Sequence, residues 1–201
     1  MNSPDSLTQL LPSILHHLCE PQTHPAGVRL FLSGRKPRWM YFVNDGEVVL
    51  ERHGANGEPA CLQRCQHGMV GEASLTAARY HCDARTTRST TVTRTPIEAM
   101  RLALTHDREF SDRWIRMLSD QVRKLRLVNE RLGLPKVKDR VLHLIETEGS
   151  QGRYTLDCSL KQLASQLAVT HEALYRALAE LDRTRQIVRT GNQIRLLPSR
   201  P

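Results

Sequence analysis

The chain has few aromatic residues and no long apolar run. Phe, Trp and Tyr make up 4% of its 201 residues, so a surface that stacks the bases of single-stranded nucleic acid is not expected. No stretch of about 18 apolar residues occurs, and Asp5 precedes the first Lys or Arg, so the sequence predicts neither a membrane span nor a signal peptide. We expect a cytoplasmic protein.

Cysteine and acidic residues are also scarce. The odd number of five cysteines in a protein expected in a reducing compartment favours thiols over disulfides. They are Cys19, Cys61, Cys65, Cys82 and Cys158. Acidic residues number 21 against 29 Lys and Arg, which gives a net charge of +8. A basic chain favours polyanionic partners, although charge alone says nothing about the fold.

Short apolar stretches separated by turn signals fill the region from Val28 to Leu104. The clearest stretches are residues 28–32, 39–43 and 47–50. The turn signals are Ser33-Gly34, Asp45-Gly46 and Asn56-Gly57. This spacing predicts an all-β sandwich or barrel. Asp-Gly and Asn-Gly supply the positive φ of tight hairpins, so antiparallel neighbours are expected at these turns. Residues 7–18 have helical spacing and are expected to pack on this domain.

A heptad pattern replaces the β pattern at about Asp107 to Arg131. Its apolar positions alternate by three and four, and charged residues occupy the other faces, which predicts one long helix. The stripe consists of Ile115, Leu118, Val122, Leu125, Asn129 and Leu132. Either the helix lies on its own β domain, or the stripe is a parallel dimer seam. Asn129 favours the dimer, because a lone Asn at such a position fixes register by pairing with its symmetry mate. Gly133 and Pro135 end the helix.

The C-terminal third predicts three helices and a short strand. An amphipathic helix over residues 136–148 and a short strand near 154–156 come first. Ser159 and Gln162 then form a capping-box pattern that opens a short helix. Thr170 can cap a second helix that runs to about Arg183, apolar on one side and polar near its start.

This arrangement matches the helix-turn-helix, whose second helix enters the major groove of DNA. Glu172 can accept from cytosine N4 and Arg176 can donate to guanine O6 and N7; the alternative is a solvated helical pair between them. Residues 187–196 read as a hairpin wing with phosphate-contacting arginines. The candidate DNA-binding residues are Ser159, Lys161, Thr170, His171, Glu172, Tyr175, Arg176, Arg189 and Arg195.

The order of these segments resembles the CRP/FNR family of transcription regulators, the cyclic AMP receptor protein-like group. Three stretches carry the likeness. They are Arg38-Trp-Met-Tyr-Phe-Val-Asn-Asp-Gly-Glu-Val, similar to the family's LYFVxxGxV hairpin, Gly71-Glu-Ala-Ser-Leu, similar to its Gly-Glu turn, and His171-Glu-Ala-Leu-Tyr-Arg, similar to its recognition helix.

The resemblance implies an α+β fold with three parts. These are a β jelly-roll domain of the cyclic-nucleotide-binding type with an N-terminal helix (1–104), a dimerisation helix (105–133) and a winged helix-turn-helix (134–201). It further implies a homodimer on an inverted DNA repeat, with Glu172 and Arg176 reading the half-site core, RNA polymerase as a protein partner, and no enzymatic activity.

The effector pocket implied by the family departs from its pattern here. Its positions correspond to Gly71, Glu72, Ala73, Ser74, Cys82, Asp83, Val128 and Asn129. Cyclic-nucleotide binders carry Arg-Ser or Arg-Thr where this chain has Cys82-Asp83, and an Asp repels a phosphodiester. Arg79 and Arg85 are the alternative cations nearby. We expect an atypical pocket and no dependence on cyclic AMP.

Other sensors and an enzyme are the alternatives. Haem or another metal at His81 and Cys82, or a redox pair of Cys61 and Cys65 on one strand face, would make the chain a sensor regulator. An iron-sulfur cluster needs four thiolates, and only Cys19 precedes residue 60. A cupin-like metalloenzyme is the most remote reading, because its candidate ligands lack the expected spacing. Those candidates are His53, Glu58, His67, Glu72 and His81.

Overall fold

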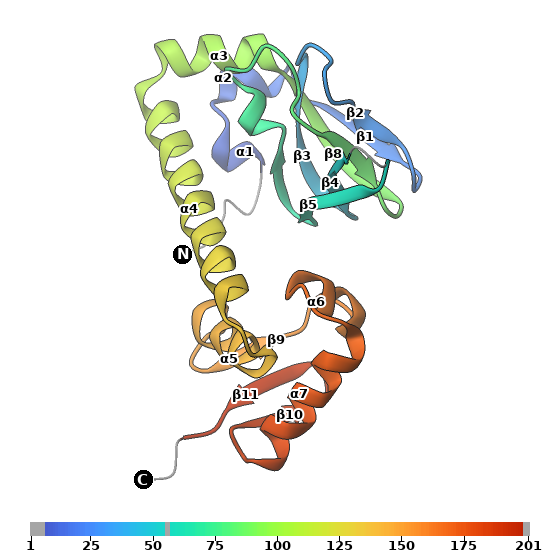
Figure 1. Cartoon of the computed structure of the whole chain (residues 1–201). Coiled ribbons are helices and arrows are strands. Elements are labelled where there is room, and N and C mark those ends of the chain that lie inside the picture. The colour runs from blue at the N-terminus through green and yellow to red at the C-terminus, as the bar shows by residue number, and fades with distance from the viewer. Residues whose placement is uncertain (1–6, 55–56, 199–201) are drawn as a thin grey trace. The chain divides into compact units, whose positions relative to one another are not determined.

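The computed structural model describes residues 7–54 and 57–198 and divides the chain into two compact units (Figure 1). Unit 1 is Met1–Ser119 and unit 2 is Asp120–Pro201. The division falls inside helix α4 (Arg108–Gly133), the long helix expected from the heptad pattern. The domain limits near residues 104 and 133 therefore remain predictions. Within the described residues, no helix combines the length and the apolar character needed to cross a bilayer.

Unit 1 contains two four-stranded antiparallel sheets. One has the order β1 (Glu20–His24), β8 (Thr90–Pro96), β3 (Trp39–Asp45) and β6 (Gly68–Val70). The other has the order β2 (Arg29–Phe31), β7 (Asp83–Thr86), β4 (Val48–His53) and β5 (Pro59–Cys65). Buried side chains from both sheets share one core cluster, so the sheets pack face to face. This is the strand order of a jelly roll, as the family resemblance implies.

One of the two predicted hairpins, that at Asp45-Gly46, is wrong, and the turn signal at Ser33-Gly34 also marks a change of sheet. β3 and β4, on either side of Asp45-Gly46, lie in different sheets, and so do β2 and β3, on either side of Ser33-Gly34. Gly46 has φ +94°, and a Cβ there would lie 2.5 Å from the Cα of Thr90. The chain therefore passes from one sheet to the other at Gly46, where only glycine fits both the positive φ and the close approach of Thr90. Only the third turn joins paired strands, β4 and β5; Gly57 has φ +77°, and Asn56 lies outside the described residues.

The N-terminal helix expected over residues 7–18 is two short helices, α1 (Leu7–Leu10) and α2 (Ser13–His16). Pro12 separates them with an extended backbone (φ −68°, ψ 149°), because its ring cannot continue the preceding turn. The sequence analysis also missed α3 (Ile97–His106), which lies at the end of the segment expected to be β.

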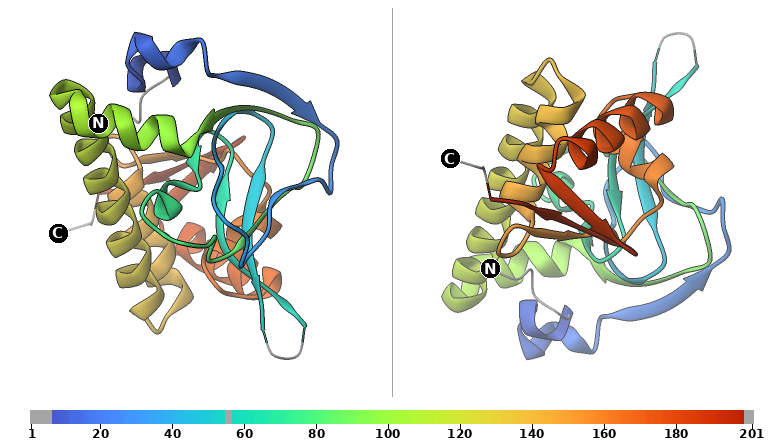
Figure 2. Two further views of the ribbon diagram at one scale, coloured as in Figure 1. Left: turned by 90° about the horizontal axis from the view of Figure 1, so that it is seen from above. Right: turned by 90° about the horizontal axis from the view of Figure 1, so that it is seen from below.

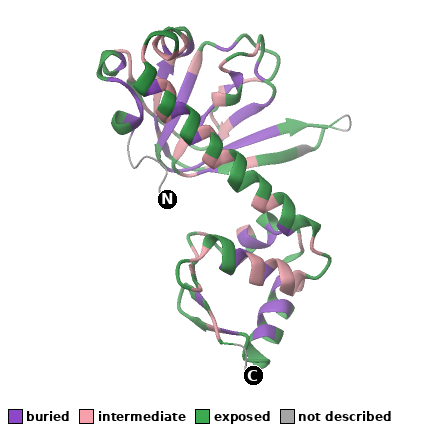
Figure 3. Cartoon of the chain, turned by 90° about the vertical axis from the view of Figure 1, so that its left-hand side faces the viewer, coloured by how far each residue is buried: buried purple, intermediate pink, exposed green. Residues whose placement is uncertain are grey.

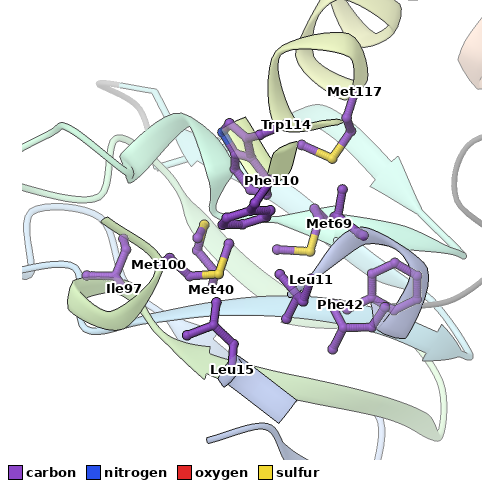
Figure 4. Close-up of a cluster of buried hydrophobic side chains, with 12 residues drawn as sticks. Leu11, Leu15, Met40, Phe42, Met69, Ile97, Met100, Phe110, Trp114 and Met117 are labelled. Carbon is purple, nitrogen blue, oxygen red and sulfur yellow. The ribbon is translucent and has the colours of Figure 1, made fainter. Parts of the chain in front are cut away.

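These helices close the second core of unit 1, drawn in Figure 4. It is formed by Leu7, Leu10, Leu11, Leu15, Met40, Phe42, Met69, Ile97, Met100, Phe110, Trp114 and Met117.

Unit 2 contains the helices and strands expected of the C-terminal third (Figure 2, right). They are α5 (Val137–Glu148), β9 (Arg153–Thr155), α6 (Leu160–Gln166), α7 (His171–Arg183), β10 (Ile187–Thr190) and β11 (Gln193–Leu196). The strands form a sheet in the order β10-β11-β9. The apolar sides of α5, α6 and α7 and Ile187 and Ile194 of the hairpin form one buried cluster.

Candidate nucleic-acid interface

The start of α6 is fixed by the predicted capping box. The Gln162 backbone N–H donates to the Ser159 hydroxyl at 3.2 Å, and the Ser159 backbone N–H donates to the Gln162 side-chain oxygen at 3.0 Å. These bonds satisfy N–H groups that a helix start otherwise leaves unpaired. Ser159 and Lys161 are exposed at this end, whereas Leu163 is fully buried.

The turn between α6 and α7 depends on Ala168 and on an arginine from another helix. Ala168 has φ +52°, the left-handed conformation usually filled by glycine in such turns. Arg140 of α5 donates to the carbonyl of Leu167 at 2.8 Å and to that of Leu134 at 2.7 Å. The Arg140 guanidinium there supplies a donor to an unpaired carbonyl at the end of α6, and its positive charge interacts favourably with the negative end of the helix dipole. No sequence pattern pointed to Arg140, because its partners are backbone carbonyls 6 and 27 positions away.

Helix α7 is buried on one side and open on the other. Its Thr170 cap accepts from the Ala173 N–H at 3.2 Å, as predicted. Leu174, Ala177, Leu178 and Leu181 are buried. On the opposite side His171, Glu172, Tyr175 and Arg176 are polar or exposed, and the His171 and Tyr175 rings meet edge to face at 4.6 Å. The structure thus brings four of the predicted site residues together over the first two turns.

Glu172 and Arg176 are both exposed and form no ion pair in the described part of the chain, although the Arg176 charge contributes to lowering the pKa of Glu172. The alternative of a solvated helical pair therefore stays a prediction. Hydrogen bonds from its own backbone N–H and from the Thr170 hydroxyl lower the pKa of Glu172. The carboxylate is therefore an ionised acceptor at neutral pH, and the Arg176 guanidinium is available as a donor.

The hairpin places its two candidate arginines on opposite faces. In the register of β10 and β11, Arg189 is opposite Ile194 and Arg195 is opposite Val188. Side chains alternate along a strand, so Arg189 shares a face with the buried Ile194, and Arg195 has the other face. Arg189 also lies 3.8 Å from Asp182 of α7. Of the two arginines, Arg195 is therefore the better placed to contact a ligand outside unit 2.

Much of the long helix α4 is exposed (Figure 3), and most of its apolar stripe is among the exposed residues. The exposed fractions are 59% for Ile115, 45% for Val122, 60% for Leu125 and 38% for Leu132. Asn129 is also exposed. Leu118 differs, since it packs against the core of unit 1 together with the more deeply buried Phe110, Trp114 and Met117. One face of α4 therefore packs on unit 1, as one of the two alternatives predicts, and the dimer seam on the exposed stripe stays a prediction.

The predicted effector positions of unit 1 include a buried carboxyl group, that of Glu72. Gly71 (φ +92°) caps the short 3-10 helix η1 (Glu72–Ser74), and Glu72 Oε2 is buried without a hydrogen-bond partner among the described residues. Burial raises the pKa of Glu72, and it raises that of the Cys82 thiol to about 11. Asp83 accepts the backbone N–H of Ser33 at 2.7 Å. Val128 and Asn129, the remaining two positions, belong to unit 2.

The arginines that could replace the family's phosphate-binding arginine have other partners. The candidates from the sequence were Arg79 and Arg85. Arg79 donates to the carbonyl of Gly34 at 2.7 Å, and Arg85 forms two 2.8 Å bonds with the Glu51 carboxylate. Arg52, a third arginine, donates to the carbonyl of His81.

The predicted redox pair on one strand face is wrong. The pairing of β4 with β5 shifts by one residue between Gln63 and Cys61, and this bulge reverses the faces beyond it. Cys61 is exposed and Cys65 is buried. Likewise, His81 is exposed while Cys82 is buried. In residues 7–54 and 57–198, no three His, Cys, Asp or Glu side chains gather as a metal site.

Comparison with known proteins supports the N-terminal domain and the fold. Residues 21–107 match the family of the cyclic nucleotide-binding domain. No match was found among curated protein sequences.

Three solved structures illustrate the likeness of fold. FixK2 from Bradyrhizobium japonicum has 18% identity and a TM-score of 0.66, with 89% of this chain and 92% of that chain covered. A CooA mutant from Carboxydothermus hydrogenoformans has 14% identity and a TM-score of 0.69, with 92% and 86% covered. A CRP-family transcriptional regulator from Thermus thermophilus has 20% identity and a TM-score of 0.58, with 88% and 92% covered. Residues 21–107 are thus similar to the cyclic nucleotide-binding domain, and the chain shares its fold with these solved structures, one of which is a CRP-family transcriptional regulator.

Proposed function

We propose that the protein is a sequence-specific, DNA-binding transcription regulator and not an enzyme. The observation that carries this proposal is α7, which is capped at Thr170, packed on one side and open with ionised Glu172 and exposed Arg176 on the other. Together with α6 and the β10-β11 hairpin it has the parts of a winged helix-turn-helix. Lys161, Arg189 and Arg195 would contact phosphates. RNA polymerase would be the protein partner of such a regulator.

The proposed active form is a homodimer on an inverted repeat. The exposed stripe of α4 supports this form, because Val122, Leu125 and Leu132 are apolar and 38–60% exposed on one helix. A second copy of the helix would cover them, and Asn129 would pair with its symmetry mate.

The proposed regulator does not depend on cyclic AMP. Glu72 would suit a ribose hydroxyl, but the position expected to hold a phosphate-binding arginine carries the buried thiol of Cys82. The arginines of the surrounding strands and loops already bind Glu51 and backbone carbonyls. A cyclic phosphate brought there would lack the cation that offsets its desolvation.

Selection from a pool of random double-stranded DNA tests the proposed function. The wild-type chain is expected to enrich an inverted repeat whose half-sites lie about one helical turn, roughly 34–36 Å, apart. As a control, Arg126→Gln on an exposed part of α4 should return the same site. Failure to enrich any sequence, or enrichment of single half-sites only, would contradict the proposal.

Sedimentation of two neighbouring α4 variants tests the dimer. Leu125→Asp is expected to weaken self-association at least about tenfold, because a charge on the stripe would be desolvated without a partner. The control Arg126→Asp introduces the same side chain one position away, outside the stripe, and is expected to stay dimeric. A wild-type chain that is monomeric at micromolar concentration and still binds its DNA site specifically would refute the dimer.

A further inference from the structure

A basic groove lies on unit 1 where β2 leads into β3. Its volume is about 470 Å³, within the usual range of ligand sites, roughly 300–1,000 Å³. It is lined by Arg29, Leu30, Phe31, Leu32, Arg35, Lys36, Arg38, Trp39, Tyr41 and Tyr80. None of these residues is itself a predicted effector or DNA-binding position, but Phe31 and Trp39 lie next to Gly71, so the groove adjoins the predicted effector positions.

The charge of the groove is one-sided. Arg29, Arg35, Lys36 and Arg38 are exposed, and the described lining holds no carboxylate. None of the four forms an ion pair with a carboxylate in the described part of the chain. Glu51, which Arg29 influences at longer range, is bound by Arg85 through both its oxygens. Four cations thus face one cavity without an internal counterion among the described residues, which favours a multiply charged anion.

The loop that carries three of these cations is held rigidly. The Tyr80 hydroxyl accepts the backbone N–H groups of Arg38 at 3.3 Å and Trp39 at 3.2 Å. The Tyr80 backbone N–H donates to the carbonyl of Arg35, and its carbonyl accepts the N–H of Gly34. Arg35, Lys36 and Arg38 therefore project from a fixed backbone, which lowers the entropy lost when a ligand binds.

The floor of the groove is aromatic. The rings of Phe31 and Tyr80 stack with centroids 4.1 Å apart and planes 12° apart. The Tyr41 hydroxyl donates to the carbonyl of Leu30 at 2.9 Å, and that of Tyr80 donates to the carbonyl of Trp39 at 2.6 Å. Both hydroxyls are thus already used. Phe31, Tyr41 and Tyr80 are 5–7% exposed, so the floor presents a narrow apolar strip of ring edges, and the charged recognition is left to the rim.

We propose that this groove binds an aromatic polyphosphate of the nucleoside triphosphate class. Its phosphates would lie among Arg29, Arg35, Lys36 and Arg38, and its base would lie against the aromatic floor. A terminal phosphate alone carries about −1.5 to −2 charges at neutral pH, so a polyphosphate matches four cations better than a cyclic phosphodiester with its single charge does. The proposal holds whether or not the chain binds DNA.

Calorimetry on the full chain with magnesium-free adenosine triphosphate tests the site. We expect one ligand per chain, bound at least about tenfold more tightly than inorganic triphosphate or adenosine alone, and not displaced by equimolar cyclic AMP. Arg38→Gln is expected to weaken binding about tenfold. Because Tyr80 holds the backbone of Arg38, this variant removes the charge without releasing the loop.

Two matched variants distinguish this site from general attraction to a basic protein. Arg108→Gln removes an exposed arginine elsewhere on unit 1, and Arg176→Ala removes one from α7; both are expected to leave the affinity unchanged. Equal losses in Arg38→Gln and Arg108→Gln, loss of binding in Arg176→Ala, or no binding at millimolar ligand would overturn the proposal. Equal affinity for inorganic triphosphate and the nucleotide would also overturn it, because the floor would then not contact the base.

Discussion

Arg176→Ala is expected to bind the selected DNA site about 5- to 150-fold more weakly than the wild-type chain, which corresponds to about 1–3 kcal/mol. The side chain extends from the exposed side of α7, away from the buried stripe of that helix, so truncation leaves the core of unit 2 intact. The discrimination among the four base pairs should relax at one position of each half-site. A gel-shift titration against the selected site and its single-base variants measures both effects.

Arg195→Ala provides the matched comparison on the hairpin. As a phosphate contact it should weaken binding to all sequences alike and lower the slope of log affinity against log salt by about one. The assignment of Arg176 to a base fails if Arg176→Ala shows this uniform pattern, or if its affinity equals that of the wild type.

Arg85→Ala is expected to lower the free energy of unfolding of unit 1 by about 3 kcal/mol at pH 7. The Glu51 side chain is 6% exposed and accepts two 2.8 Å bonds from Arg85, so the variant leaves a carboxylate buried without its partner. The value is at the lower end for a broken buried pair because the Arg85 side chain is itself 34% exposed. Urea unfolding followed by tryptophan fluorescence reports on this unit, since Trp39 and Trp114 both belong to it.

The stability lost in Arg85→Ala is expected to depend on pH through Glu51. The hydrogen bond from Arg85 is the largest cause that holds the pKa of Glu51 below its usual value. Such a carboxyl stabilises the fold above its unfolded pKa of about 4.3 and loses that contribution as the pH falls through its folded pKa. In the variant Glu51 takes up a proton more readily. The difference in the free energy of unfolding between the wild type and the variant should therefore shrink as the pH is lowered from about 7 towards about 4.

Two further variants check the interpretation. Glu20→Gln disrupts the exposed pair with Arg94, in which the Glu20 side chain is 50% exposed, and should cost less than about 1 kcal/mol. Adding Glu51→Gln to Arg85→Ala should recover part of the lost stability by removing the buried charge. A deficit that grows towards acid pH would show that Glu51 is not the group left unpaired.

The C-terminal unit was the most predictable part of the molecule because its signals are local. Ser159 and Thr170 cap α6 and α7 through bonds to residues three positions away, so a few residues determine each helix start. The exposed side of α7 follows from helical spacing alone. By contrast, Arg140 acts through carbonyls of distant segments, and a pattern of side-chain types does not encode such a contact.

The errors in unit 1 share a physical cause. Asp45-Gly46 supplies a positive φ, but that conformation serves a change of sheet as well as a hairpin, and the choice depends on strands distant in sequence. The alternation that put Cys61 and Cys65 on one face holds only in a regular strand, and the bulge arises from pairing with β4. Pro12 was the exception, since its effect on the first helix is local and its signal was present in the sequence.

The strand order of unit 1 also bears on how the chain folds as it is synthesised. β1 pairs with β8, with Glu20 opposite Arg94. The first strand of unit 1 therefore lacks this partner until β8, the last strand of the two sheets, has left the ribosome. Pairings this distant close slowly and expose unpaired strand edges meanwhile. The sequence of β1 is Glu-Pro-Gln-Thr-His. A polar segment with a proline is a poor template for cross-β stacking. The composition of β1 therefore protects the nascent chain against aggregation while β1 is unpaired.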